Sequence, residues 1–127
     1  MAIKKHNPEG LYPQYSNYSH AVEVSDSSLL FISGLNGYLQ DRKTIPDSFD
    51  EQCDLIWGYL GKILKSALMD YKNLVSLRIY LASPEYRKNN GLMLKKYLGN
   101  HEPSLTVVCA QLLDPSWLLE IEATAAK

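Results

Sequence analysis

Two glutamates near the C-terminus are the residues of this chain best suited to acid–base chemistry. Glu120 and Glu122 alternate with Leu119 and Ile121 in a segment of strand-like period. Because successive side chains of a strand point to opposite faces, both carboxylates share one face and the apolar residues share the other. A carboxylate in partly apolar surroundings can act as a general base or orient an attacking water. The pattern therefore predicts a candidate catalytic carboxylate, Glu120, on that face.

A second alternating segment precedes the glutamates. It covers residues 103–110, and a break at Asp114 and Pro115 separates it from the glutamate segment. Such a break suits a turn, so the spacing predicts a hairpin that sets Glu120 beside Leu105. The residue at position 105 would then help to decide what the carboxylate acts on.

Histidine and cysteine show no pattern of metal or redox chemistry. His6, His20 and His101 share no ligand spacing, such as two histidines four apart on a helix, so no metal site is expected. Cys53 and Cys109 lie far apart and form no CxxC motif. They are interpreted as free thiols in a reducing compartment.

Length and composition narrow the class of protein. The 127 residues suit a single domain, 1–127, and a net charge of -1 with scattered Lys and Arg argues against nucleic acid as a partner. There is no apolar run of roughly eighteen residues and no apolar signal core after the first residues. The expectation is a cytoplasmic protein without membrane contact.

The first third of the chain favours an irregular arm followed by strands. Residues 1–19 are rich in Pro, Tyr, Asn and Ser, which predicts the arm. Residues 20–24 and 29–35 flank a turn at 26–28, so the spacing predicts a first hairpin. Residues 36–37, Asn-Gly, predict a second turn of the kind that tolerates positive φ.

A long helix is the strongest local prediction. Ser48 with Glu51 three positions later has the spacing of a capping box, and apolar residues recur at helical spacing from 49 to 67. Ser83 and Pro84 predict the start of a second helix, and Gly99 predicts its end.

Residues 74–81 alternate as a strand between the two helices. The order strand-strand-helix-strand-helix-strand-strand predicts an α+β fold, one sheet with two helices on one face. The other face is expected to carry a mixed set of side chains that is too apolar for water, which favours a symmetric oligomer. These residues are Arg78, Tyr80, Leu105, Val107 and Cys109.

Five segments give the chain a resemblance to a known family. They are residues 18–22 (Tyr-Ser-His-Ala-Val), 30–34 (Leu-Phe-Ile-Ser-Gly), 75–81, 97–99 (Tyr-Leu-Gly) and 103–123. Over nearly its whole length the chain resembles the RidA (YjgF) family of reactive imine and enamine deaminases. The last segment aligns without a gap and is the most specific.

The resemblance implies a chorismate-mutase-like fold assembled as a homotrimer, with small-molecule clefts between neighbouring subunits and no metal or organic cofactor. In that family the substrate is an unstable enamine or imine, released by pyridoxal-phosphate dehydratases and hydrolysed to a 2-keto acid and ammonia. Partners of this chain would thus be a small imine, enamine or keto acid and further copies of itself.

Site residues follow from the resemblance position by position. The family's water-orienting Glu falls on Glu120, its cleft Tyr on Tyr18, and its pocket-lining Ser-Gly on Ser33 and Gly34. The Arg that clamps the substrate carboxylate falls on Leu105. An isobutyl group cannot imitate a planar bidentate donor.

Two other positions also lack the polar residue that the family has there. Val107 stands where the family often has Cys, and the family's helix Asn falls on Gly91, beside Asn90. By strand parity Arg78 is expected on the same face as Leu105, where it could replace the clamp. The alternative role of Arg78 is an ion pair between subunits with a carboxylate such as Glu122.

Three functions remain open from the sequence. The first is a trimeric protein that binds a small metabolite, with weak, altered or absent imine or enamine hydrolysis because Leu105 replaces the family Arg. The second is an active 2-imino acid deaminase that uses Arg78 or backbone amides near Gly34 for the carboxylate. The third is a chaperone-like or translation-related interaction protein.

Overall fold

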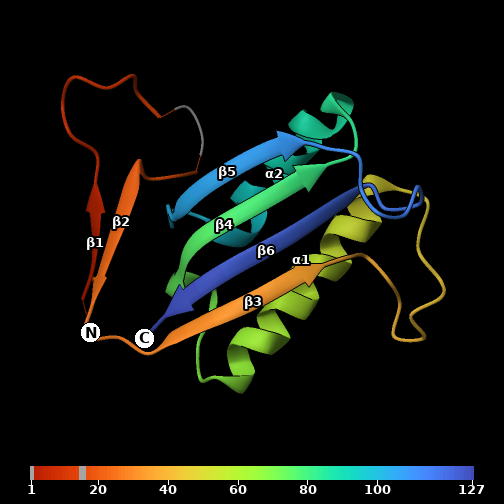
Figure 1. Cartoon of the computed structure of the whole chain (residues 1–127), viewed down its shortest axis with the longest axis horizontal. Coiled ribbons are helices and arrows are strands. Elements are labelled where there is room, and N and C mark those ends of the chain that lie inside the picture. The colour runs from red at the N-terminus through yellow and green to blue at the C-terminus, as the bar shows by residue number, and fades with distance from the viewer. Residues whose placement is uncertain (1, 15–16) are drawn as a thin grey trace.

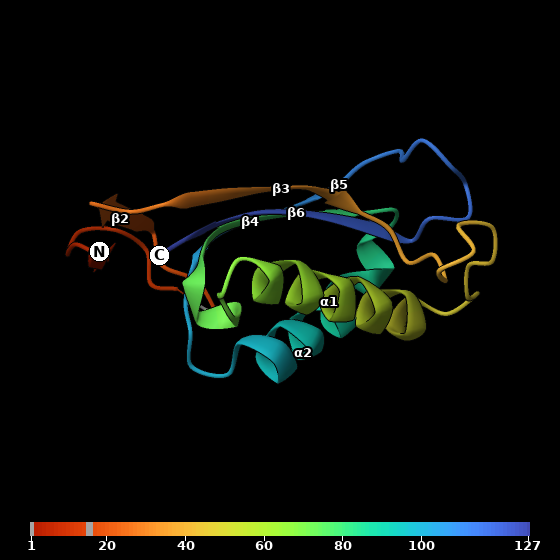
Figure 2. The same cartoon turned by 90° about the horizontal axis from the view of Figure 1, so that it is seen from below.

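The computed structural model describes residues 2–14 and 17–127. Its main body is a four-stranded mixed sheet in the order β3-β6-β4-β5, with a separate two-stranded ribbon, β1-β2, at one end of the sheet (Figure 1). Both helices lie on the same side of the sheet, so the opposite face is open (Figure 2). The strands are β1 Ala2–His6, β2 Ala21–Ser25, β3 Leu29–Leu35, β4 Leu74–Leu81, β5 Ser104–Cys109 and β6 Leu119–Ala126; the helices are α1 Phe49–Ser66 and α2 Arg87–Leu98.

The helices begin and end where the sequence predicts. The Ser48 side chain accepts a hydrogen bond from the Glu51 amide at the start of α1. Ser83 and Pro84 begin a short 3-10 turn, Pro84–Tyr86, that leads directly into α2. Gly99 ends α2 with a φ of 59°, a left-handed value that glycine adopts without steric cost.

The core lies between the sheet and the helices. Along β6 the residues alternate between buried and half-buried, with Leu119, Ile121 and Ala123 buried toward the helices. From α1, Trp57 and Leu60 pack into the same core and are fully buried. The predicted division of β6 into an apolar face and a carboxylate face is therefore confirmed.

The predicted C-terminal hairpin is wrong. β4 lies between β5 and β6; it pairs with β5 in parallel and with β6 antiparallel. The connection 110–118 is long enough to cross from β5 over β4 to β6. β6 therefore lies inside the sheet and pairs on one edge with β3 and on the other with β4. Glu120 is consequently opposite Tyr80, and not beside Leu105.

The predicted first hairpin is also wrong. β2 pairs with β1, whereas β3 pairs with β6, so the two strands on either side of Asp26 belong to different sheets. Residues 2–6 of the predicted irregular arm form β1. The amide and carbonyl of Ser28 instead exchange hydrogen bonds with Lys127.

The φ of Gly37 is not positive, although the turn predicted at Asn36 and Gly37 is of a kind that tolerates a positive φ. A Cβ at this position would lie 2.6 Å from Cβ of Gln52, so the glycine allows the loop to approach α1 closely. Gln52 is 1% exposed and binds that loop and the 110–118 connection: its Nε2 donates to the carbonyls of Pro46 (2.7 Å) and Ser116 (2.9 Å).

The expected face of β5 needs correction as well. Leu105 is in register with Leu77, Val107 with Ile79 and Cys109 with Leu81. Paired residues of neighbouring strands point to the same side, and these β4 partners are buried against the helices. The odd-numbered residues of β5 therefore lie on the helix side of the sheet, while Arg78 and Tyr80 lie on the open side.

In the described part of the chain, no helix is both long and apolar enough to cross a membrane.

Candidate functional site

A small pocket on the open face of the sheet contains Glu120. Its volume is about 310 Å³, and β3, β4, β6 and the start of the 110–118 connection line it. Glu120 and Gly34 meet there: a Cβ on Gly34 would lie 2.2 Å from Oε1 of Glu120. The missing side chain thus leaves the space that the carboxylate occupies. We call this site the sheet-face pocket.

The two carboxylates of β6 have different environments. The Tyr80 hydroxyl donates a 2.5 Å hydrogen bond to Oε1 of Glu122, and Arg78 lies 4.0 Å from the same oxygen. The hydrogen bond to Glu122 holds the pKa of Tyr80 above its usual value. In the ranges 2–14 and 17–127, no residue donates a hydrogen bond to Glu120.

Partial burial, and next the charge of Glu122, raise the pKa of Glu120. A carboxyl group whose pKa lies above the ordinary value is better suited to exchange protons near neutral pH. Glu120 is therefore the stronger acid–base candidate of the pair, and Glu122 is a charged neighbour fixed by Tyr80.

A larger groove lies on the helix side, between α2 and the outer edge of β5. Its volume is about 990 Å³. Tyr18, Leu105 and Val107, three of the predicted site residues, line it. Arg87, Lys88 and Asn90 of α2 line it as well. We call this site the α2 groove.

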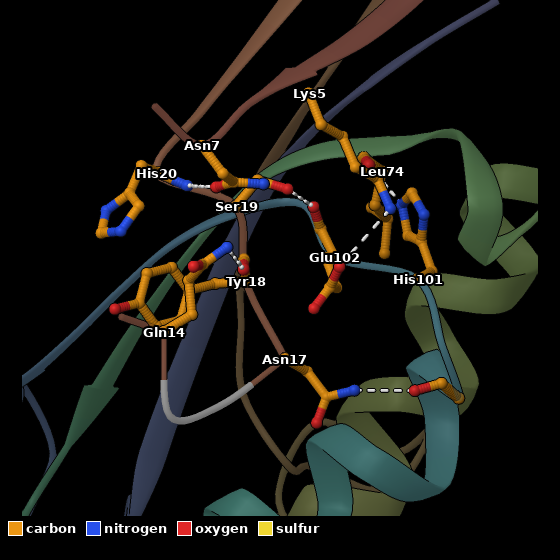
Figure 3. A network of polar contacts seen from close by, with 11 residues as sticks. Lys5, Asn7, Gln14, Asn17, Tyr18, Ser19, His20, Leu74, His101 and Glu102 are labelled. Carbon is orange, nitrogen blue, oxygen red and sulfur yellow. Dashed lines mark hydrogen bonds and ion pairs between the residues drawn. The ribbon is translucent and has the colours of Figure 1, made fainter. Parts of the chain in front are cut away.

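The segment that carries Tyr18 is held by polar contacts at the start of β5 (Figure 3). The Ser19 amide donates to the carbonyl of Pro103 (2.9 Å), and its hydroxyl donates to the carbonyl of Glu102 (2.5 Å). Asn17 donates to the carbonyl of Gly99 (2.7 Å). Ser19 also forms an isolated parallel bridge with Ser104. Tyr18 is thereby held near Leu105 by contacts with residues 99–104, between the end of α2 and the start of β5.

The histidines near this segment form hydrogen bonds and ring contacts within the fold. His20 donates its backbone amide to Asn7, and its ring packs edge-on against Tyr12 and Tyr18. The His101 ring hydrogen-bonds the carbonyl of Leu74 (Figure 3). Among the described residues, no three His, Cys, Asp or Glu side chains gather as metal ligands would.

Within a single chain, the predicted site residues lie in two separate places. Glu120 and Gly34 lie in the sheet-face pocket, whereas Tyr18, Leu105 and Val107 lie in the α2 groove on the other side of the sheet. Ser33 is exposed and lines neither space.

Arg78 also fails the role predicted from strand parity. It lies on the open face near Glu122, whereas Leu105 faces the helices, so within one chain Arg78 cannot substitute for an Arg at position 105. The proximity to Glu122 occurs inside the chain, at 4.0 Å.

Sequence reasoning missed the contribution of α2. Arg87 and Lys88 stand near the start of the predicted second helix and resemble ordinary solvent-facing charges. Gly91 was an available signal, because glycine inside a helix is unfavourable and needs a reason. Tyr80 as the neighbour of Glu120 depends on the pairing of β4 with β6, which was not predicted from the sequence.

The fold and these two sites define a class: small α+β domains of chorismate-mutase-like fold. A family model described as Endoribonuclease L-PSP matches residues 11–127. The chain therefore belongs to this family, that of the Rid (RidA, YjgF) proteins, and the resemblance inferred from the sequence is confirmed.

Known relatives agree with this assignment. The chain is 28% identical over 109 residues to the chloroplastic Reactive Intermediate Deaminase A of Arabidopsis thaliana, which covers 85% of this chain and 57% of that protein. The chain thus spans little more than half the length of this curated relative.

Solved structures show the same fold. YyfB from Yersinia pestis, a protein of unknown function of the conserved Rid family, has a TM-score of 0.87, with 28% identity and full coverage of both chains. RidA from an Antarctic Psychrobacter has a TM-score of 0.73 at 19% identity, covering 91% of this chain and 92% of that one. The predicted α+β fold with two helices on one sheet face is confirmed.

Proposed function

We propose that this chain forms a homotrimer that binds a small metabolite, an imine, enamine or keto acid, in clefts between neighbouring subunits. Hydrolysis of the family's usual substrate is weak, altered or absent. The observation that carries the proposal is Leu105, which lines the α2 groove and stands at the position to which the resemblance assigns the family's carboxylate-binding Arg. The printed name of the Arabidopsis relative, a reactive intermediate deaminase, supports the reaction class.

The position of the two sites supports an assembly. Glu120 and Leu105 lie on opposite sides of the sheet, so a single cleft can contain both only if two copies contribute. A contact of the open face of one copy with the α2 groove of the next is heterologous, and such contacts close into rings when the rotation permits. A ring also covers the exposed apolar side chains of the open face, among them Phe31, which is 75% exposed.

Glu120 is the group that would act on an imine. Its carboxylate takes a proton from a water molecule as the water oxygen bonds to the C=N carbon, and the nitrogen receives that proton. The resulting carbinolamine loses ammonia and leaves a 2-keto acid. The raised pKa of Glu120 suits both proton transfers, because a carboxylate with a raised pKa is a stronger base toward the water proton than an ordinary one.

Leu105 removes a clamp and leaves Glu120 in place. Hydrogen bonds to charged groups contribute about 1.5 to 3 kcal/mol each, so losing two of them weakens carboxylate binding by roughly two to four orders of magnitude. Acid binding at position 105 is therefore lost, while the carboxylate that would activate water remains.

The test is hydrolysis of a 2-imino acid generated in situ, followed by release of ammonia and keto acid. We expect slow release by the wild type, a gain of about 100-fold or more in Leu105→Arg, and no gain in the neutral control Leu105→Met. Adding Glu120→Gln to Leu105→Arg should remove the gain. A wild type already as fast as Leu105→Arg would overturn the proposal.

That outcome would favour the second candidate, an active 2-imino acid deaminase. Its two suggested clamps, the backbone amides near Gly34 and Arg78, both lie on the open face with Glu120: Gly34 lines the sheet-face pocket, and Arg78 is 4.0 Å from Glu122. A chaperone-like or translation-related role has no support beyond the exposed apolar side chains. Binding of an unfolded client that persists when the clefts are blocked would favour it.

The single-domain extent 1–127 and the cytoplasmic location stay predictions. The Arabidopsis relative is named a chloroplastic protein.

A further inference from the structure

The α2 groove has two positively charged side chains on α2, although position 105 in its β5 wall has none. Arg87 and Lys88, at the first positions of α2, both line the groove, together with one carboxylate, Glu85. Within the described residues, no carboxylate oxygen lies within 4.0 Å of the Lys88 ammonium. The rim of the groove thus has an excess of positive charge next to Leu105 and Val107.

We propose that this chain binds the carboxylate of its ligand from α2, through Arg87 and Lys88, at a place displaced from position 105. The inference rests on the proposed function, in which a small metabolite occupies this groove. It names the ligand class: small carboxylic acids with an apolar side chain and a hydrogen-bond donor.

The donor requirement comes from Asn90. This residue is 3% exposed, lines the groove, and its Oδ1 is buried without a hydrogen-bond partner. Buried polar atoms are almost always paired, because an unpaired one is costly. An amino, imino or hydroxyl group of a ligand would give Oδ1 its missing donor.

The space for the ligand comes from Gly91. A Cβ added to this residue would meet no atom within 4 Å, so neither packing nor a special φ accounts for a glycine inside α2. Glycine is less favourable than alanine in a helix interior. Because Gly91 lines the groove, its missing side chain widens the space between α2 and β5.

The apolar preference comes from β5. Leu105 and Val107 form that wall of the groove, and neither can pair with a charge. A carboxylate held by Arg87 and Lys88 leaves the rest of a small acid against these side chains. The C=N or C=O carbon would then sit away from the place that an Arg at position 105 would give it, which explains retained acid binding with weak hydrolysis.

Calorimetric titration of the full chain with 2-hydroxybutanoate and with its uncharged amide, 2-hydroxybutanamide, tests the inference, because the hydroxyl group of both compounds supplies the donor for Asn90. We expect the acid to bind more tightly than the amide. Arg87→Gln and Lys88→Gln should each weaken acid binding by about tenfold to a hundredfold and leave amide binding unchanged. Lys95→Gln, which removes an equal charge from α2 outside the groove, is the matched control and should change neither affinity.

Each outcome has a defined meaning. Equal binding of acid and amide, or acid affinity that is insensitive to Arg87→Gln and Lys88→Gln, overturns this inference and leaves the proposed function intact. Binding of neither compound overturns both. Sedimentation of every variant confirms that a loss of binding is not a loss of assembly.

A pair of glycine variants tests the space requirement separately. Gly58 of α1 also has no atom within 4 Å of an added Cβ, but it lies outside the groove. Gly91→Ala should weaken binding of both compounds, whereas Gly58→Ala should not. Equal effects of the two substitutions on binding would contradict a role of Gly91 in shaping the groove.

Discussion

Gly34→Ala tests whether the position of the Glu120 carboxylate matters. The new Cβ would lie 2.2 Å from Oε1, and an ordinary van der Waals contact begins at 3.4 Å, so the carboxylate must move by about 1.2 Å. The atom that must move is the end of a flexible side chain, and Gly34 does not have a positive φ. We therefore expect a change in the free energy of unfolding of less than about 1 kcal/mol.

The effect on function should be much larger than the effect on stability. A displacement of about 1 Å in a catalytic arrangement costs on the order of 100-fold in rate. The assay is imine hydrolysis in a Leu105→Arg background, where the expected activity is high enough to measure a loss. A second readout is the pKa of Glu120, followed by carbon NMR in wild-type and Gly34→Ala protein. Displacement from its partly buried position should lower this pKa toward the ordinary value.

Gly58→Ala serves as the control, because an added methyl there meets nothing. Full hydrolysis by Gly34→Ala, in a protein that Glu120→Gln inactivates, would refute the reasoning: the working carboxylate would then not lie over Gly34. An unchanged pKa of Glu120 in Gly34→Ala would lead to the same conclusion without any assay of turnover.

Three further predictions concern stability and reactivity. Gln52→Ala should lower the free energy of unfolding by about 3 kcal/mol in urea titrations, since it leaves the carbonyls of Pro46 and Ser116 without their donor; a loss below about 1 kcal/mol would contradict this. The raised pKa of Glu120 means that the folded state holds its proton more tightly, so stability falls as pH rises from the ordinary value of about 4.3 through the folded pKa. Glu120→Gln should thus stabilise the protein above that window and not below it, and the same gain at every pH would argue against a raised pKa. Burial, and next the charge of Asp54, raise the pKa of Cys53 to about 12, so its alkylation at pH 8 should require unfolding, and rapid native-state labelling would disprove the burial.

Helices and individual strands were predictable because their signals are local. The Ser48 cap, the Ser83-Pro84 start and the Gly99 end each depend on residues within one turn of the helix boundary. The strand 74–81 follows from its alternation and has the predicted bounds. These features need no knowledge of which elements pack together.

Strand pairing was not predictable from adjacency. The hairpin inference assumes that neighbouring strands in the sequence pair, but β4, α2 and β5 form a strand-helix-strand unit whose strands pair in parallel. The sequence contained that signal, because a helix of about a dozen residues between two strands is the usual parallel crossover. With β5 on one edge of β4, β6 and its glutamates lie on the other edge.

The face of each site residue follows from this pairing. The parallel register that sets Leu105 opposite the buried Leu77 turns it toward α2, while the antiparallel register that sets Glu120 opposite Tyr80 turns it to the open face. A hairpin would have joined the two residues in one pocket of one chain. Within one chain the observed sheet keeps Glu120 apart from the α2 groove, so the proposed chemistry, which needs both, depends on contact between copies of the chain.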